Sequence, residues 1–195
     1  MILTREFLQS EARRRDINNS SQSRILNESH KLFFSQKENY DLFLSHSYLD
    51  KALVLTLVDL FTKAGYYIYV DWIDDVQLDR RNVTASTANF IKTRIKQCKG
   101  LSYVSTSNIV SSKWCPWELG VADGLHDGKA CILPILNQGN SYNGQEYLGL
   151  YPYIEYNRRN NSDYVYDFWV HDPKDRRKYI VLRNWLSGKQ PFIHY

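Results

Sequence analysis

The amino-acid sequence predicts an α/β fold with a central, mostly parallel sheet and helices on both of its faces. Short runs rich in β-branched and aromatic residues alternate with stretches whose apolar residues recur at helical spacing, which is the pattern of βαβ units. The chain has 195 residues, of which 43% are hydrophobic and 24% charged. This length and composition fit one substantial core, so we expect one main domain with extensions.

The first two predicted strands flank a helical pattern. Residues 40–45 (YDLFLS) form a short apolar strand, and a helix-period stretch over residues 52–64 follows it and ends at Gly65. Residues 66–70 (YYIYV) form the second strand and lead into an acidic loop over residues 71–81. Strand, helix and strand in this order predict a parallel pair joined by a crossover helix.

The next two strands follow from the same alternation. A helix with apolar residues on one face over residues 88–95 closes near Gly100, and residues 101–105 (LSYVS) form the third strand. After a turn and a tryptophan-rich helix, residues 130–136 (ACILPIL) form the fourth strand. Pro134 lies within it and disfavours a central position in the sheet, because proline has no N–H to donate.

The ends of the chain carry weaker patterns. A fifth strand is expected around residues 153–156 and a last helix near residues 176–186. Residues 6–15 and 23–34 are two short helical stretches in a polar N-terminal arm, which Phe33-Phe34 would dock on the main domain or use as an oligomer interface. We divide the chain into an N-terminal helical extension (1–37), a core (38–157) and a C-terminal extension with the final helix (158–195).

Composition argues against several functional classes. No run of 18 or more apolar residues occurs and the N-terminus lacks the pattern of a secretory signal, so we expect a cytoplasmic protein without membrane contact. Cys98, Cys115 and Cys131 are far apart and have no histidine at zinc spacing, which predicts buried thiols and no metal. The net charge of +4 comes largely from basic runs without an aromatic–basic repeat, so we expect no nucleic-acid binding.

The segment SKWCPWELG, residues 112–120, is the strongest candidate for a functional site. It places Glu118 among indole rings at a helix start, where Pro116 fits the first turn and the preceding serines can cap it. Trp114 and Glu118 are four residues apart and share a helix face, so we expect Trp114 to line a pocket and Trp117 to pack in the core. The alternative is a surface glutamate beside core tryptophans.

The predicted order of the strands places other polar residues close to Glu118. The five strands predict the flavodoxin-like order 2-1-3-4-5, in which ligands bind beyond the carboxyl ends of the first and third strands. The loop after the first strand is Ser45-His46-Ser47, and the loop after the third ends at the helix carrying Glu118. The sequence has no dinucleotide-binding glycine motif, no P-loop and no acidic pair for a receiver-domain magnesium site.

Four motifs occur in order along the chain: YDLFLSHS from Tyr40 with Asp50, YVDW from Tyr69, QCKGL from Gln97 and SKWCPWELG from Ser112. With these motifs residues 38–137 resemble a bacterial TIR (Toll/interleukin-1 receptor) domain of the NAD-cleaving, antiphage-defence (Thoeris-like) kind. The resemblance implies a flavodoxin-like TIR fold and cleavage of NAD+ at the nicotinamide glycosidic bond, with NAD+ as substrate and no cofactor.

The resemblance also assigns roles to residues and partners. The essential glutamate of the family falls on Glu118. The implied substrate-binding residues are Ser45, His46, Ser47, Asp71, Trp72, Leu78 and Trp114. Self-association through TIR surfaces and the N-terminal arm, and a downstream effector that receives a nucleotide messenger, are implied as well.

The chemistry suits a buried carboxylate. The nicotinamide leaving group is already positively charged and needs no acid, so catalysis must orient the ribose and stabilise oxocarbenium character. Glu118 can accept hydrogen bonds from ribose hydroxyls, and an adjacent indole can stack on a base or face the pyridinium. Whether the product is ADP-ribose, a cyclic isomer or a conjugate stays open, because it depends on the nucleophile.

Two other functions stay open on the sequence alone. One is a non-catalytic TIR module that only binds other TIR domains. The other is a nucleoside deoxyribosyltransferase-like enzyme, which would use Glu118 as a nucleophile on a sugar.

Overall fold

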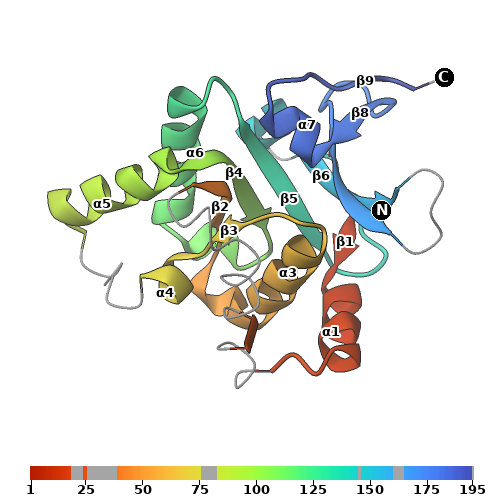
Figure 1. The fold of residues 1–195 in the computed structure, drawn as a ribbon, viewed down its shortest axis with the longest axis horizontal. Coiled ribbons are helices and arrows are strands. Elements are labelled where there is room, and N and C mark those ends of the chain that lie inside the picture. The colour runs from red at the N-terminus through yellow and green to blue at the C-terminus, as the bar shows by residue number, and fades with distance from the viewer. Residues whose placement is uncertain (19–23, 26–38, 76–82, 145, 160–164, 195) are drawn as a thin grey trace.

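The computed structural model describes residues 1–18, 24–25, 39–75, 83–144, 146–159 and 165–194, which form a mixed α/β fold on one sheet (Figure 1). The strands are β1 (Leu3–Thr4), β2 (Tyr40–Ser45), β3 (Ile68–Tyr69), β4 (Cys98–Ser105), β5 (Ala130–Leu136), β6 (Tyr153–Arg158), β7 (Tyr166–His171), β8 (Lys178–Val181) and β9 (Phe192–Ile193). The α-helices are α1 (Arg5–Arg14), α3 (Lys51–Lys63), α4 (Asp71–Asp74), α5 (Ala85–Lys96), α6 (Trp114–Leu125) and α7 (Leu182–Leu186). The 3-10 helices are η3 (Tyr48–Asp50), η4 (Ile109–Ser111) and η5 (Glu146–Leu150).

The parallel half of the sheet has the predicted topology. β2 pairs in parallel with β3 and β4, β4 pairs with β5, and β5 pairs with β6. The order β3-β2-β4-β5-β6 is therefore the expected order 2-1-3-4-5. Because the strand order reverses between β2 and β4, the carboxyl ends of these two strands border the crevice where this kind of sheet binds ligands.

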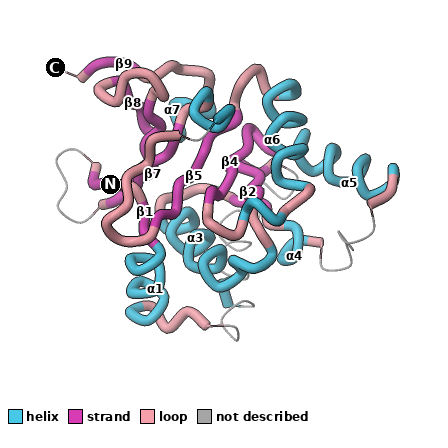
Figure 2. The backbone as a smooth tube through the Cα atoms, turned by 180° about the vertical axis from the view of Figure 1, so that it is seen from behind, coloured by secondary structure: helices cyan, strands magenta, loops and turns pink. Residues whose placement is uncertain are grey.

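Helices cover both faces of this parallel half and create two hydrophobic cores (Figures 1 and 2). Neighbouring residues of β2 point to opposite faces of the sheet. Leu42 and Leu44 lie in the core that includes residues of α1, α3 and α7, whereas Phe43 lies in the core that includes residues of α5 and α6. All six residues of β2 are buried, as expected for a parallel strand between two helical layers.

The N-terminal arm begins with a strand that the sequence did not predict. β1 pairs in parallel with the end of β5, with Leu3 opposite Ile135. The amino group of Met1 donates to the carbonyl oxygen of Tyr156 in β6, and the Tyr156 N–H donates to the Met1 carbonyl. The expected helix over residues 6–15 is confirmed as α1, which packs on α3 and buries Leu8. Most of the second expected helix, with Phe33-Phe34, lies outside the described residues.

Pro134 lies in β5, which has neighbouring strands on both sides, as the predicted strand order requires even though proline disfavours such a position. Ile132 donates its N–H to Pro152 on the side of β6, and Pro134, two residues further, faces the same side. There β6 pairs with β5 at Ile132, while β1 pairs from Ile135 onward. Pro134 therefore faces the position at which the pairing of β5 with β6 ends and its pairing with β1 begins. Proline is tolerated at this position of β5, although it has no N–H to donate.

An antiparallel extension follows the parallel half. β6 pairs with β7, β7 with β8 and β8 with β9, all antiparallel, and both chain termini lie on this side of the molecule (Figure 1). The expected helix over residues 176–186 is half wrong, because residues 178–181 (KYIV) form β8 and only Leu182–Leu186 are helical. These residues are rich in strand formers, and pairing with β7 decides their conformation.

The structure also bears on membrane-spanning helices and on the three cysteines. In the part of the chain that the structure describes, no helix is long and apolar enough to cross a membrane. Cys98, Cys115 and Cys131 are buried, as predicted. Burial raises the pKa of the Cys98 and Cys131 thiols, so both are poor nucleophiles.

Candidate active site

Glu118 and Ser45 meet at the carboxyl edge of the sheet, as the topology predicted. Ser45 is the last residue of β2, and Glu118 lies in the second turn of α6. The Ser45 hydroxyl donates to Glu118 Oε2 over 2.6 Å, and both residues are completely buried. A hydrogen bond this short to a buried carboxylate is a strong one, so Ser45 fixes the orientation of the Glu118 side chain.

The start of α6 is anchored to the loop after β2. Ser112 Oγ accepts the backbone N–H of Cys115, which satisfies one of the free N–H groups at the helix start, and Pro116 lies in the first turn as predicted. The Cys115 thiol donates to the carbonyl oxygen of His46 over 3.2 Å. The position of Glu118 is therefore coupled to that of the loop that carries Ser45.

His46 is held as a neutral ring by its two contacts. Its Nε2 lies 2.7 Å from the Nε1 of Trp72, and an indole N–H can only donate, so Nε2 is the acceptor. The other nitrogen, Nδ1, lies 2.8 Å from the carbonyl oxygen of Leu44 and therefore carries the proton. In this arrangement His46 positions Trp72 at the site, and its Nε2 lies 3.8 Å from Asp71 Oδ1.

The first turn after β3 brings Asp71 and Trp72 to the same edge. Both lie in α4, where Asp71 is buried and Trp72 is half-buried. The Lys51 ammonium lies 4.8 Å from the centre of the Trp72 ring and 3.9 Å from that of Tyr48. Asp75, the residue after α4, accepts two hydrogen bonds from Arg94 of α5, which fixes where this loop starts.

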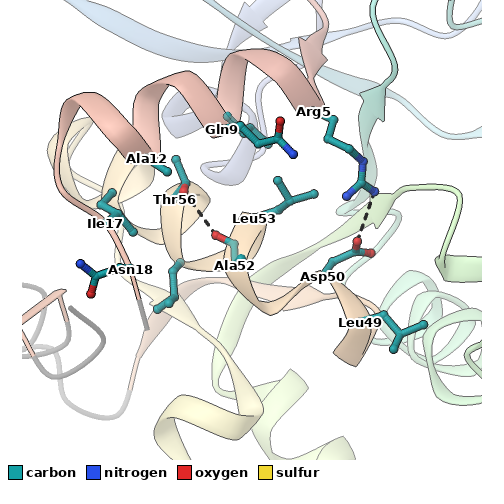
Figure 3. A pocket seen from close by; sticks show the side chains of 12 residues that line it. Arg5, Gln9, Ala12, Ile17, Asn18, Leu49, Asp50, Ala52, Leu53 and Thr56 are labelled. Atoms are coloured by element: carbon teal, nitrogen blue, oxygen red, sulfur yellow. Dashed lines mark hydrogen bonds and ion pairs between the residues drawn. The ribbon is translucent and has the colours of Figure 1, made fainter. Parts of the chain in front are cut away.

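The Asp50 carboxylate connects the loop after β2, the loop after β4 and α1. This role was not assigned to it from the sequence. Its carboxylate accepts from Thr106 Oγ1 over 2.6 Å and from Asn108 Nδ2 over 2.7 Å, so it ties the loop after β2 to the loop after β4. Arg5 of α1 reaches the same carboxylate at 3.4 Å, beside a cavity of about 160 Å³ between α1 and α3 (Figure 3). The sequence predicted a turn after the third strand, where Thr106 and Asn108 lie, but local spacing could not identify Asp50 as the acceptor for their side chains.

The two tryptophans of α6 do not divide into core and pocket. Their rings pack edge to face with centroids 5.3 Å apart, and both side chains are half-buried. Trp117 also has the Lys92 ammonium 5.8 Å from its ring centre. Trp117 and Trp114 both pack, partly buried, against the core that includes residues of α5 and α6, so Trp117 lies at the edge of the core and the two side chains are not distinguished by burial.

The remaining predicted site residues have separate placements. Ser47 is buried and its Oγ accepts the backbone N–H of Leu49, so it caps η3. Trp114 is the first residue of α6, four residues before Glu118. Leu78 lies outside the described residues. The structure thus brings the loop after β2, α4 and the start of α6 together at one edge of the sheet.

Comparison with known proteins identifies the family. A TIR domain family model matches residues 42–168. The chain is 42% identical over 171 residues, 87% of this chain and 86% of the other, to "Probable 3' cyclic ADP-D-ribose synthase ThsB'" of Bacillus cereus (strain MSX-D12). It is also 36% identical over 97 residues, 49% of this chain and 26% of the other, to "Putative cyclic ADP-D-ribose synthase TIR2" of Cytobacillus dafuensis. With a domain match over most of its length, the chain belongs to the TIR domain family.

Proposed function

We propose that this protein cleaves NAD+ between nicotinamide and ribose and closes the remaining ADP-ribose into a cyclic product. The observation that carries the proposal is a fully buried glutamate, Glu118, bound by the Ser45 hydroxyl at the carboxyl edge of the sheet. Similarity to proteins named as cyclic ADP-D-ribose synthases supports cyclisation rather than simple hydrolysis.

The bond changes of this reaction balance without a cofactor. The bond between the ribose anomeric carbon and the nicotinamide nitrogen breaks, and its electron pair neutralises the pyridinium. An internal nucleophile of the same molecule then bonds to the anomeric carbon and loses a proton. The products are nicotinamide, cyclic ADP-ribose and one proton, whereas capture by water would give ADP-ribose.

Glu118 has the properties that this transition state needs. A carboxylate in a water-poor site interacts strongly with developing positive charge on the ribose. In the described structure Oε2 is bound by Ser45 and is not exposed. We therefore propose that ribose hydroxyls take the place of the Ser45 hydroxyl as donors to Glu118 when NAD+ binds.

The other residues have supporting roles in this proposal. Trp72, held by His46, and Trp114 are the aromatic walls against which nicotinamide or adenine can lie. Ser45, His46 and Ser47 form the loop that lies along the nucleotide, and Asp71 and Leu78 complete the substrate-binding set. His46 acts in this proposal by positioning Trp72, because both of its ring nitrogens are engaged.

We also propose self-association and a signalling role. Tyr48, Leu49 and Val110 are 70%, 70% and 87% exposed, and the Asp50–Asn108 hydrogen bond keeps their two loops together beside the site. Exposed apolar side chains on two loops that are held together favour contact with another TIR domain. The cyclic product would serve as a messenger to a separate effector in antiphage defence.

The test is nicotinamide release from NAD+ by the purified protein, measured with and without a crowding agent that favours assembly. Glu118→Gln is expected to lower the rate by about 100-fold or more, because it removes the charge that stabilises the transition state. Glu146→Gln is the matched control, since Glu146 is exposed in η5, and it should retain the wild-type rate.

Three results would contradict the proposal. Equal nicotinamide release by Glu118→Gln and wild type would remove Glu118 from the chemistry. Turnover of deoxynucleosides with a sugar trapped on Glu118, and no reaction with NAD+, would favour the deoxyribosyltransferase alternative. Assembly without any turnover of NAD+ would favour the non-catalytic module.

A further inference from the structure

A second cavity lies away from Glu118, between the β5–β6 connection and the β7–β8 turn. Its volume is about 350 Å³, which is within the range of small-molecule sites and much larger than the space of one water molecule. The residues that line it include Tyr142, Gly144, Gly149, Tyr153, Pro173 and Arg176. None of them belongs to the carboxyl edge of β2 and β4 or to the start of α6.

Two tyrosine hydroxyls are buried at this cavity without a hydrogen-bond partner. Tyr153 is only 3% exposed, and the hydroxyl oxygens of Tyr153 and Tyr142 are both inaccessible and unpartnered among the residues that the structure describes. Their rings pack with centroids 5.4 Å apart. A buried hydroxyl without a partner is unfavourable, so each of these groups is available to bind a ligand.

Both hydroxyls carry their protons at neutral pH. Burial raises the pKa of Tyr142 to about 12, and burial also raises the pKa of Tyr153. Each can therefore donate one O–H to an acceptor in the cavity. Glu155 and Asp172 act in the same direction on Tyr153, but Glu155 is paired with the N-terminal amino group and Asp172 Oδ1 accepts two N–H groups of its own turn.

Arg176 adds a positive charge to these donors. Its Nη2 donates to the backbone carbonyl of Tyr142, and its guanidinium carbon lies 5.8 Å from the centre of the Tyr153 ring. Among the described residues no carboxylate forms an ion pair with Arg176, in contrast to the neighbouring Arg177, which is paired with Asp175. The carbonyl contact holds the guanidinium in place and leaves other N–H groups for an anion.

A close approach of two glycines forms another wall of the cavity. Gly144 has φ +67°, and a side-chain carbon on it would lie 2.7 Å from the Cα of Gly149. Neither the backbone conformation nor the space accepts another residue. The loop thus comes together tightly beside the two hydroxyls and the guanidinium.

We propose that this cavity is a second, non-catalytic site that binds a small phosphate-bearing molecule. The phosphate oxygens would accept from Tyr142, Tyr153 and Arg176, which together offer two neutral donors and one cationic donor. The volume leaves room for a group attached to the phosphate. This site does not depend on the function proposed for Glu118, since it shares no residue with it.

Calorimetric titration of the full chain with inorganic pyrophosphate and with ribose 5-phosphate tests the proposal. At least one of the two probes should bind with one site per chain. Arg176→Ala and Tyr153→Phe should each weaken that binding by about tenfold or more, while Arg177→Ala and Glu118→Gln should leave it unchanged. Tyr153→Phe keeps the ring, and an unaltered thermal unfolding transition will show that it folds.

Four results would overturn the proposal. Equal weakening by Arg176→Ala and Arg177→Ala would mean non-specific attraction by basic side chains. Loss of binding in Glu118→Gln would place the probe at the other site. Binding of citrate with no binding of either phosphate probe would make this a carboxylate site. Absence of binding by every probe would mean that the cavity is not a ligand site.

Discussion

Replacing Ser45 by alanine tests the contact on which the candidate site depends. The change removes the hydroxyl that donates to Glu118 Oε2 over 2.6 Å in a fully buried setting. A hydrogen bond to a charged group contributes about 1.5–3 kcal/mol to folding. We therefore expect Ser45→Ala to lower the free energy of unfolding by about 2 kcal/mol, which for a chain of this size lowers the melting temperature by about 4–8 °C.

A double-mutant cycle separates this contact from general effects of the substitution. In a Glu118→Gln background the same serine donates to a neutral amide oxygen, and the bond then contributes only about 1 kcal/mol. The coupling between the two positions is expected to be about 1 kcal/mol. Urea denaturation followed by circular dichroism measures each term, with the slope in urea unchanged.

An exposed serine provides the control for that cycle. Ser187 donates only to the backbone of its own turn, so Ser187→Ala should change stability by less than about 0.5 kcal/mol. If Ser45→Ala had as small an effect, the Ser45–Glu118 bond would not exist in solution. If it had the same effect with glutamate and with glutamine at position 118, the carboxyl would be neutral, and stabilisation of positive charge by Glu118 would be refuted.

Three further predictions concern Asp50, His46 and His126. Asp50→Ala should lower the free energy of unfolding by about 2–4 kcal/mol in urea denaturation, because it leaves the buried Thr106 hydroxyl and the part-buried Asn108 amide without an acceptor; a loss below about 0.5 kcal/mol would contradict this. Nitrogen NMR should show His46 protonated at Nδ1 only, and Trp72→Phe should shift its Nε2 signal; a proton on Nε2 in the wild type would contradict the assigned contact. Burial lowers the pKa of His126 below its unfolded value of 6.5, so its contribution to stability is present above pH 6.5 and is lost as the pH falls below it. His126→Asn should therefore reduce the loss of stability on acidification in pH-dependent urea denaturation, and an unchanged pH dependence would exclude this role.

The parallel half of the fold was predictable because its pattern is local. Strand 40–45 and the helix that follows it are set by apolar periodicity and by Gly65, and the strand order follows from βαβ geometry. That topology also predicted that Ser45 and Glu118 would meet, although they are 73 positions apart in the sequence. In this kind of sheet ligands bind where the strand order reverses, so the order of the strands is enough to locate the site.

The features that the sequence did not predict depend on distant partners. β1 has two residues, too few for any periodic pattern, and exists because β5 offers a free edge beyond Ile132. The segment 178–181 is compatible with helix or strand until it meets β7. Asp50 is one carboxylate among many in the sequence, and only the folded chain brings the loop after β4 to it.

Mass spectrometry of the products formed from NAD+ by the assembled wild-type protein tests whether Glu118 catalyses cyclisation. We predict nicotinamide together with a nucleotide one water lighter than ADP-ribose, and neither product from Glu118→Gln. ADP-ribose as the sole nucleotide product would contradict cyclisation. The same products from wild type and Glu118→Gln would contradict the assignment of the reaction to Glu118.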